Sequence, residues 1–304
     1  MRDMDITDAR TFIVVAEAGS ISRAARELHL TQPAVTRRIQ RLEQAIGTRL
    51  IDRRKRPFAL TDVGQAAIER CRRIVSMRDE LKALAQGGVV PTRECRIGAA
   101  HALTELALTE PLDELRTAFP AVVPRLSTGW SRDLAERVRS GALDAAAVLL
   151  PRGDSLPAGV NGQELAAEQL QIVASRALHP RTLTLKEAAA MEWILNPEGC
   201  GARAILQKAF GRAGLSLRVG VETYNYELQM SLVARGRGLG LVPSRLVARS
   251  AVKRQLSVLG VRGLEFPMTI WMLTAGLPSA LETALEAFTD SLQRRLSPKR
   301  GAKS

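Results

Sequence analysis

Three short helices are predicted near the start of the chain, because apolar residues recur there every three or four positions. They span residues 7–18, 20–30 and 31–46, and Gly19 and Gly47 end the first and the third. The residues expected to face inward are Ala9, Phe12, Ile13 and Ala16 on the first helix, and Val35, Ile39, Leu42 and Ile46 on the third. Each stripe is narrow, so the opposite face of each helix is left to solvent or to a partner.

The outward face of the third helix carries hydrogen-bond donors and no acid. Its residues are Pro33, Thr36, Arg37, Gln40, Arg41 and Gln44. Threonine and glutamine can hydrogen-bond base edges in a DNA major groove, while guanidinium groups bind phosphates or guanine. Thr31 can cap this helix, and Pro33 is tolerated within its first turn. The preceding helix carries Ala24 and Ala25, where another helix can approach closely, so the pair predicts a helix-turn-helix.

A basic hairpin is predicted directly after the third helix. Two short apolar segments, 50–51 and 58–60, flank a turn that contains Arg53, Arg54, Lys55 and Arg56. The chain has a formal net charge of +13, and residues 37–56 hold eight Lys and Arg against two acids. A charge run is commonly a solvated surface, but this one covers a helix face and a hairpin. That placement favours DNA, whose minor groove or flanking phosphates the hairpin can reach.

A long helix is predicted from Thr61 to about Gln86, where Gly87 and Gly88 end it. Its apolar positions step by three or four residues, as in the seam of a coiled coil. They are Ala67, Cys71, Ile74, Met77, Leu81 and Leu84. Such a helix either packs on its own domain or pairs with a second copy. The narrow stripe favours a dimer helix, in which Cys71 is a small seam residue and not a redox switch.

Strands and helices alternate after Pro91. Strands are predicted at 96–100, 122–127, 145–150, 170–174, 193–195, 217–221, 239–242 and 267–273, and helices include 103–119, one that ends at Gly141, and 279–296. This alternation predicts α/β subdomains with largely parallel sheets.

The segment from Ile6 to Thr61 resembles the winged helix-turn-helix of LysR-type transcriptional regulators, which are bacterial proteins. The matching residues follow in order and without gaps: Phe12, Ala16, Gly19, Ser20, Ala24, Ala25, Leu28, Thr31, Gln32, Pro33, Ala34, Leu42, Glu43, Gly47, Leu50, Leu60 and Thr61. One departure is Arg38, where glutamine is common in the family, and we expect it to add a phosphate contact. The later chain also fits the family, so the resemblance covers nearly all of the sequence.

This resemblance implies a winged helix-turn-helix with a long linker helix, followed by a two-lobed α/β sensor of the periplasmic-binding-protein type. The implied domains are 1–61 for DNA binding, 62–90 for linking and dimerisation, and 91–304 for effector binding. Lobe 1 is expected to comprise about 91–163 and 267–296, and lobe 2 about 167–264. The chain is expected to cross between the lobes near 162–168 and near 263–267.

Ligands of open α/β sheets bind beyond the carboxyl ends of strands, near helix N-termini. Four stretches meet that description, and related sensors take effector contacts from these positions. The residues expected to contact an effector are Ala100, His101, Trp130, Ser131, Asn196, Cys200, Arg203, Thr223, Tyr224 and Asn225. Ala100 and Cys200 stand where Ser or Thr is frequent in the family, so backbone amides and not hydroxyls would hold a carboxylate. Trp130 and Tyr224 favour an aromatic or partly apolar effector, with core packing as the alternative.

Three other classes of function fit the sequence less well. An enzyme is disfavoured, because the three histidines lie far apart in sequence and no P-loop, Gly-x-Ser-x-Gly or metal-ligand spacing occurs. A solute-binding protein fits the sensor part but not the DNA-binding segment. A thiol sensor using Cys200 lacks a second cysteine nearby in sequence.

The sequence therefore predicts a cytoplasmic regulator with no cofactor, no metal and no membrane segment. Its expected partners are an inverted-repeat DNA operator, a small effector that is aromatic or a carboxylate, and RNA polymerase if it is an activator. The expected assembly is a homodimer or homotetramer.

Overall fold

The fold was established from a computed structural model of the 304-residue chain, which describes residues 4–52, 58–85, 92–177, 182–276 and 279–297. The chain divides into two compact units. Met1–Arg93 form most of the first, and Glu94–Arg139 with Leu143–Ser304 form the second. No helix among the described residues is long and apolar enough to cross a membrane.

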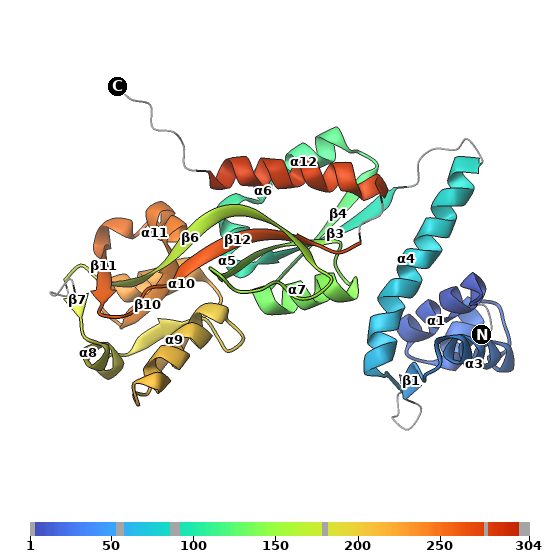
Figure 1. The fold of residues 1–304 in the computed structure, drawn as a ribbon, viewed down its shortest axis with the longest axis horizontal. Helices are drawn as coiled ribbons and strands as arrows, with labels where there is room; N and C mark the ends of the chain where they lie inside the picture. Colours follow the sequence, from blue (N-terminus) through green and yellow to red (C-terminus); the bar gives the residue numbers. More distant parts are fainter. Residues whose placement is uncertain (1–3, 53–57, 86–91, 178–181, 277–278, 298–304) are drawn as a thin grey trace. The chain divides into compact units, whose positions relative to one another are not determined.

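The first unit begins with the predicted three helices, α1 (Ile6–Ala18), α2 (Ile21–Glu27) and α3 (Gln32–Ile46) (Figure 1). Each begins after a side-chain cap, supplied by Asp5, Ser20 and Thr31 respectively. Their shared core contains Ala9, Phe12, Val15, Ala24, Ala25, Val35, Ile39 and Leu42. One prediction of an inward residue was wrong, because Ile46 is 39% exposed at the end of α3. Ile13 and Ala16 are half-buried and pack against this core, and Val15, which was not predicted, is buried in it.

A two-stranded antiparallel hairpin follows, made of β1 (Ile51–Asp52) and β2 (Ala59–Leu60). The carboxylate of Glu43 on α3 accepts hydrogen bonds from the amides of Leu50 and Ile51, at 2.9 and 3.3 Å. These bonds fix the start of the hairpin to α3. The predicted basic turn, with Arg53, Arg54, Lys55 and Arg56, lies outside the described residues.

The long helix α4 spans Asp62–Ala85. Its first half packs within its own unit, where Cys71 is buried and Ala67 is half-buried against the core of α1–α3. Cys71 is therefore part of the core of its own unit and is only 3% exposed, which leaves little of its side chain for the predicted dimer seam. Further along, Ile74 is half-buried, whereas Met77 and Leu81 are 59% and 69% exposed. The side chain of Leu84 is not among those described.

The second unit is built on one long mixed sheet with the strand order β4-β3-β5-β12-β6-β10-β8-β9. The strands of lobe 1 are β3 (Arg93–Ala100), β4 (Val122–Gly129), β5 (Ala145–Pro151), β12 (Pro267–Thr274) and the first part of β6 (Asn161–Ser175). Its helices are α5 (His101–Ala107), α6 (Thr109–Ala118), α7 (Ser131–Ser140) and α12 (Ser279–Leu296). The helices α6 and α12 cover one face of this part of the sheet and α7 covers the other (Figure 1).

Lobe 2 continues the same sheet. Its strands are the last part of β6, β10 (Leu239–Pro243), β8 (Trp193–Leu195), β9 (Val219–Glu222), β11 (Leu256–Val261) and β7 (Thr182–Leu183). Its helices are α8 (Leu185–Ala190), α9 (Gly201–Arg212), α10 (Tyr226–Ala234), α11 (Ser244–Arg249) and the short 3₁₀ helix η1 (Lys253–Gln255). The short strands β7 and β11 were not predicted.

Two further sequence predictions need correction. The helix predicted over 103–119 is two helices, because Pro111 has no amide hydrogen to donate to the carbonyl of Ala107. The sheet is less parallel than predicted. β3 runs parallel to β5, and β8 parallel to β9 and β10, but β12 runs antiparallel to β5 and β6. β10 is also antiparallel to β6.

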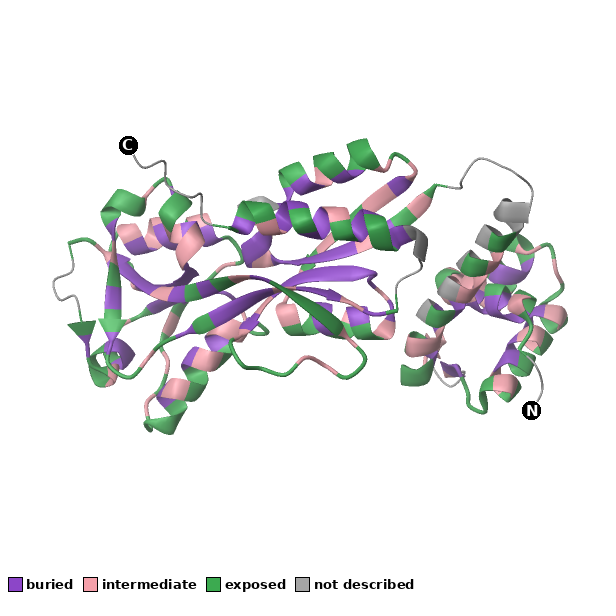
Figure 2. Ribbon diagram, turned by 45° about the horizontal axis from the view of Figure 1, so that its top comes forward, coloured by how far each residue is buried: buried purple, intermediate pink, exposed green. Residues whose placement is uncertain are grey.

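The two lobes share strand β6, which pairs with β12 as far as Gln169 and with β10 from Leu170. One apolar core runs from lobe 1 along β6 to the α10 and α11 side of lobe 2, and a second core lies under α8 and α9. Figure 2 shows the buried residues following the strands through both lobes. The lobes are therefore joined by packing as well as by the two chain crossings.

A buried carboxylate, that of Glu168, lies where β6 passes between the lobes. Its Oε1 accepts hydrogen bonds from the amides of Gln169 and Ser244 and from the Ser244 hydroxyl, at 2.8, 3.1 and 2.5 Å. Its Oε2 accepts one from Arg245 Nη1 at 3.0 Å. Arg245 in turn donates to the carbonyl of Leu296 at the end of α12, at 2.8 Å. Glu168 thus links the crossing strand to α11 in lobe 2 and, through Arg245, to α12 in lobe 1.

Candidate functional site

The outward face of α3 is open in the first unit. Thr31, Gln32, Pro33, Arg37 and Gln40 are exposed. Thr36 is half-buried. The guanidinium of Arg37 has no hydrogen bond or ion pair with any residue in the described part of the chain. Within the described part of the chain, Arg37 therefore offers free donors on this face, which is what a helix needs for contact with base edges and phosphates.

Two arginines of α3 are less free than predicted. Arg41 Nη2 donates to Oδ1 of Asp8 at 2.5 Å, and the Asp8 side chain is only 4% exposed. Hydrogen bonding to Asp8 raises the pKa of Arg41. Arg38 Nη1 donates to the hydroxyl of Thr11 on α1 at 3.2 Å. Both side chains therefore hold α3 against α1. Arg41 is still about half exposed, but its ion pair with the buried Asp8 partly neutralises its charge.

The aromatic side chains predicted for the sensor cleft come together from three separate loops. The rings of His101 and Trp130 are 4.8 Å apart and edge-on, and the rings of His101 and Tyr224 are 5.4 Å apart. Trp130 and Tyr224 stack at 5.6 Å. His101 begins α5 after β3, Trp130 follows β4, and Tyr224 follows β9. The carboxyl ends of these strands therefore meet, as predicted for an open α/β sheet.

The indole of Trp130 lies over the loop that precedes α9 in lobe 2. A Cβ atom on Gly199 would lie 2.6 Å from Cδ1 and 2.8 Å from Nε1 of this indole. Gly199 also has a φ of +94°, a conformation that L residues rarely adopt. Glycine is therefore required here for two reasons, and the two lobes touch directly at this point.

A small cavity of about 30 Å³ lies behind this contact. Five of the predicted residues line it, namely Ala100, His101, Trp130, Ser131 and Cys200. Sequence reasoning missed its other walls, which are Ala102, Leu149, Leu170, Gly201, Ala202, Tyr226 and Met268. The volume is close to that of one water molecule, whereas pockets for small molecules are usually about 300–1,000 Å³. In this conformation the protein's own aromatic rings fill the cleft.

The remaining predicted effector residues do not line this cavity and are engaged elsewhere. Asn196 donates to the carbonyl of Thr223 at 2.8 Å, and the side chain of Asn225 caps α10. Arg203 is buried and donates to Glu222 at 2.6 Å and to the carbonyl of Asn196 at 3.4 Å. These three side chains therefore hold the walls of lobe 2 in place.

Burial favours the neutral forms of two ionisable groups of the cavity. Burial lowers the pKa of His101 and raises the pKa of the Cys200 thiol. Cys200 is 5% exposed, and its sulfur lies 3.9 Å from Oδ1 of Asn196. A protonated, buried thiol is a poor nucleophile, which argues against the alternative of a thiol sensor at Cys200.

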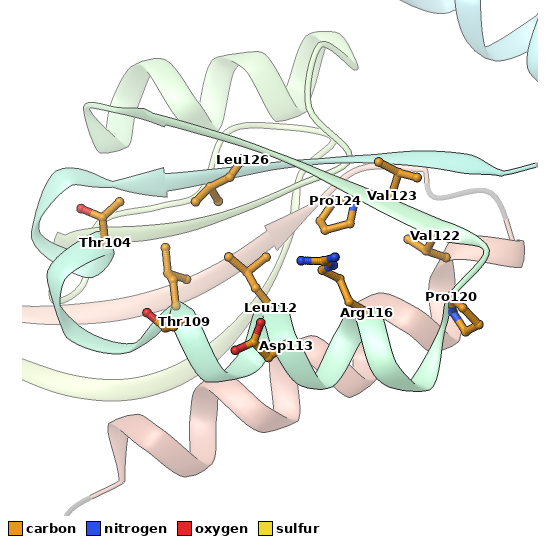
Figure 3. A pocket seen from close by; sticks show the side chains of 11 residues that line it. Thr104, Thr109, Leu112, Asp113, Arg116, Pro120, Val122, Val123, Pro124 and Leu126 are labelled. Atoms are coloured by element: carbon orange, nitrogen blue, oxygen red, sulfur yellow. The ribbon is translucent and has the colours of Figure 1, made fainter.

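A larger hollow of about 780 Å³ lies on the outer side of lobe 1, between α6 and β4 (Figure 3). Leu112, Val122 and Leu126 give it an apolar wall, and Arg116 and Asp113 lie at its helical side. None of the predicted effector residues lines it. The only sequence signal for it was the apolar composition of the edge strand β4.

Comparison with known proteins gives a consistent result for both units. The family described as LysR substrate binding domain matches residues 89–297, and that described as bacterial regulatory helix-turn-helix protein, lysR family, matches residues 6–65. The transcriptional regulator CzcR of Bacillus anthracis is 29% identical over 244 residues, which cover 80% of this chain and 82% of that protein. The transcriptional activator CmpR of Synechocystis is 25% identical over 301 residues, 96% of each chain.

Solved structures share the fold. The crystal structure of ArgP from Mycobacterium tuberculosis superposes with a TM-score of 0.76 at 21% sequence identity, covering 97% of this chain and 98% of that chain. At that identity, the likeness shows the arrangement of helices and strands and does not identify the ligand.

Proposed function

The chain belongs to the LysR family of transcriptional regulators, and from that premise we propose how its parts divide the work. It is a DNA-binding regulator with an effector-binding domain. Residues 1–61 read an operator, residues 62–90 link and dimerise, and residues 91–304 bind a small effector between two lobes. The protein acts through binding and not through catalysis, and it acts in the cytoplasm, where its DNA is.

The observation that supports DNA reading most directly is the open donor face of α3. The bases of the operator are read by Gln32, Thr36, Arg37 and Gln40, while Thr31 and Pro33 shape the start of the helix. Arg38 and Arg41 orient α3 through α1 and contact phosphates with the donors that remain. The wing residues Arg53, Arg54, Lys55 and Arg56 contact the flanking backbone.

Two recognition helices on one inverted repeat require a symmetric oligomer. The exposed Met77 and Leu81 on α4 support a dimer contact along the second half of that helix. Ala67 and Cys71 do not take part, because they are covered within their own unit. A dimer is the smallest assembly that meets this requirement, and a tetramer contains two such pairs of recognition helices. An activator would also contact RNA polymerase.

The effector acts at the contact between Trp130 in lobe 1 and the Gly199 loop in lobe 2. A ligand shifts the balance between two lobe arrangements only as far as it binds them differently. The 30 Å³ cavity leaves no room for an aromatic effector unless Trp130 moves. Effector entry and Trp130 displacement are therefore one event, and the change of lobe arrangement is what the DNA-binding unit senses.

The test is an effector titration followed by operator footprinting, with the parent protein and the Trp130→Ala variant. Trp130→Ala should abolish the effector response and leave operator binding without effector nearly unchanged. Cys200→Ser should have a milder effect, because it keeps a small polar side chain in the cavity wall. A Trp130→Ala protein that responds at the parent's effector concentration would remove this cleft from the proposal.

A further inference from the structure

A second, roomier groove lies on the flank of the interlobe contact. Its volume is about 600 Å³, and it shares Ser131, Leu149 and Gly201 with the small cavity behind Trp130. Lobe 1 contributes the start of α7 and the end of β5, and lobe 2 contributes one face of α9 and the segment before β12. Unlike the 30 Å³ cavity, this groove has the size of a small-molecule site.

The groove combines an apolar floor with a cationic rim. Leu150 and Phe266 are buried in its lining, and Ile205 is half-buried. The rim carries the exposed cations Arg132, Arg152, Lys208 and Arg212 and the exposed acids Asp154 and Glu265. The lining therefore has an excess of two positive charges.

The four cations are available for a ligand. None of them has an ion pair or a side-chain hydrogen bond with any other residue in the described ranges. Arg132 and Arg152 belong to lobe 1, while Lys208 and Arg212 lie one turn apart on the same face of α9 in lobe 2. An anion between the two pairs would be attracted by both lobes at once.

We propose that this groove binds a small organic anion that carries two negative charges and an apolar body. The charge of such a ligand balances the excess on the rim, and its apolar part covers the floor of Leu150, Ile205 and Phe266. A neutral aromatic molecule would leave the four cations unpaired. A small inorganic anion would leave the apolar floor bare.

The regulatory role of this ligand rests on the proposed function of the chain as an effector-responsive regulator. A dianion that draws Arg152 and α9 together favours the arrangement in which the lobes touch at Trp130 and Gly199. The groove thus offers a ligand site that does not require Trp130 to move. Its binding chemistry, in contrast, can be measured without reference to DNA.

The test is calorimetric titration of the full chain with terephthalate and phenyl phosphate. Three matched probes each lack one feature of these dianions. Benzoate carries only one negative charge, terephthalamide carries none, and inorganic phosphate has no apolar body. We expect at least one of the two dianions to bind about tenfold more tightly than every matched probe, and its binding to weaken with added salt. Preference for terephthalate would indicate that the natural ligand places one carboxylate against each wall of the groove. Preference for phenyl phosphate would indicate a ligand with a single phosphate group at one end.

Two double variants locate the site. Lys208→Gln with Arg212→Gln should weaken binding of the preferred dianion by about tenfold or more, because neither side chain can then donate a charge-assisted hydrogen bond to it. Arg235→Gln with Arg237→Gln is the control, since it removes two exposed cations of lobe 2 that do not line the groove. Folding is checked for each protein by its unfolding midpoint.

Unchanged dianion affinity in the Lys208 and Arg212 variant would overturn the proposal, as would a parent protein that binds neither dianion more tightly than the matched probes. Operator binding of each protein is measured in parallel. If the parent protein does not bind the operator, the proposed function is contradicted, but the result on dianion binding still holds. Retained operator binding without dianion binding would contradict the groove alone.

Discussion

Trp130 and Gly199 touch across the two lobes, and the glycine leaves no room for a side chain. A Cβ at position 199 would lie 2.6 Å from the indole of Trp130. The contact is therefore sensitive to a single methyl group. It joins the loop after β4 to the loop before α9, and Trp130 also lines the small cavity together with Cys200 and Ser131.

Gly199→Ala should force the indole of Trp130 out of its present position. The new methyl group collides with the ring, and alanine is strained at a φ of +94°. We expect a loss of about 1–3 kcal/mol in the free energy of unfolding. We also expect an altered tryptophan fluorescence spectrum in the native state, measured on the full chain.

Gly153→Ala is the matched control for this change. Gly153 has a φ of +88°, and a Cβ there would meet no atom within 4 Å. It carries the same backbone strain without the collision. If both variants lose equal stability and neither changes the fluorescence spectrum, contact with Trp130 is not the reason why position 199 requires glycine.

Glu168→Gln should destabilise the sensor unit by about 2–3 kcal/mol, because it leaves Arg245 beside a neutral and nearly inaccessible side chain. The Glu168 side chain is 1% exposed and accepts four hydrogen bonds, one of them from Arg245. Chemical denaturation followed by circular dichroism measures the change.

Glu110→Gln provides the comparison for Glu168. Glu110 pairs with Arg295 at 3.2 Å, but both side chains are about half exposed. Exposed pairs of this kind contribute about 0–1 kcal/mol. Equal losses from the two substitutions would show that the charge at the lobe crossing has no special role.

Cys200 should resist alkylation and peroxide in the folded protein. Burial raises the pKa of its thiol above the ordinary value, so the reactive thiolate is scarcer at neutral pH than in an exposed cysteine. Cys71 and Cys95 are also buried, and the pKa of Cys95 is raised to about 12. We expect mass spectrometry to find iodoacetamide adducts only after unfolding. Rapid oxidation of native Cys200 with a change in operator affinity would revive the thiol-sensor alternative.

The sequence predicted the elements whose pattern is local. The helix-turn-helix follows from apolar spacing, from the cap at Thr31, and from the stop at Gly47. The meeting of the His101, Trp130 and Tyr224 loops follows from a rule about strand ends, which holds without knowledge of packing.

The contacts that sequence reasoning missed join residues far apart in the chain. Arg41 pairs with Asp8, which lies 33 positions earlier, and no periodicity within α3 indicates that partner. Glu168 reaches Ser244 and Arg245 in the same way, across more than 70 positions. The sequence placed Trp130 at a loop of the cleft. Whether its ring lines an open site or fills a closed one depends on Gly199 in the other lobe.

The wing makes a prediction about salt. Converting Arg53, Arg54 and Lys55 together to Ala should lower affinity for specific and random DNA alike. It should also flatten the dependence of log affinity on log salt concentration, by about 0.9 for each phosphate that the protein no longer neutralises. Fluorescence anisotropy over a range of salt concentrations measures both effects. If log affinity depends on log salt concentration as steeply in the triple variant as in the parent protein, these charges are only solvated and do not contact DNA.

The central claim is that the outward face of α3 reads the operator, and footprinting with Arg37→Ala and Thr36→Ala tests it most directly. The operator is one selected from random DNA by the parent protein, and Arg10→Ala, which removes an exposed cation from α1, is the control. Each α3 variant should keep the parent's unfolding midpoint and lose about 1–3 kcal/mol of binding energy, with relaxed preference at the contacted base pair. Unchanged affinity and unchanged sequence preference in both variants would contradict the claim.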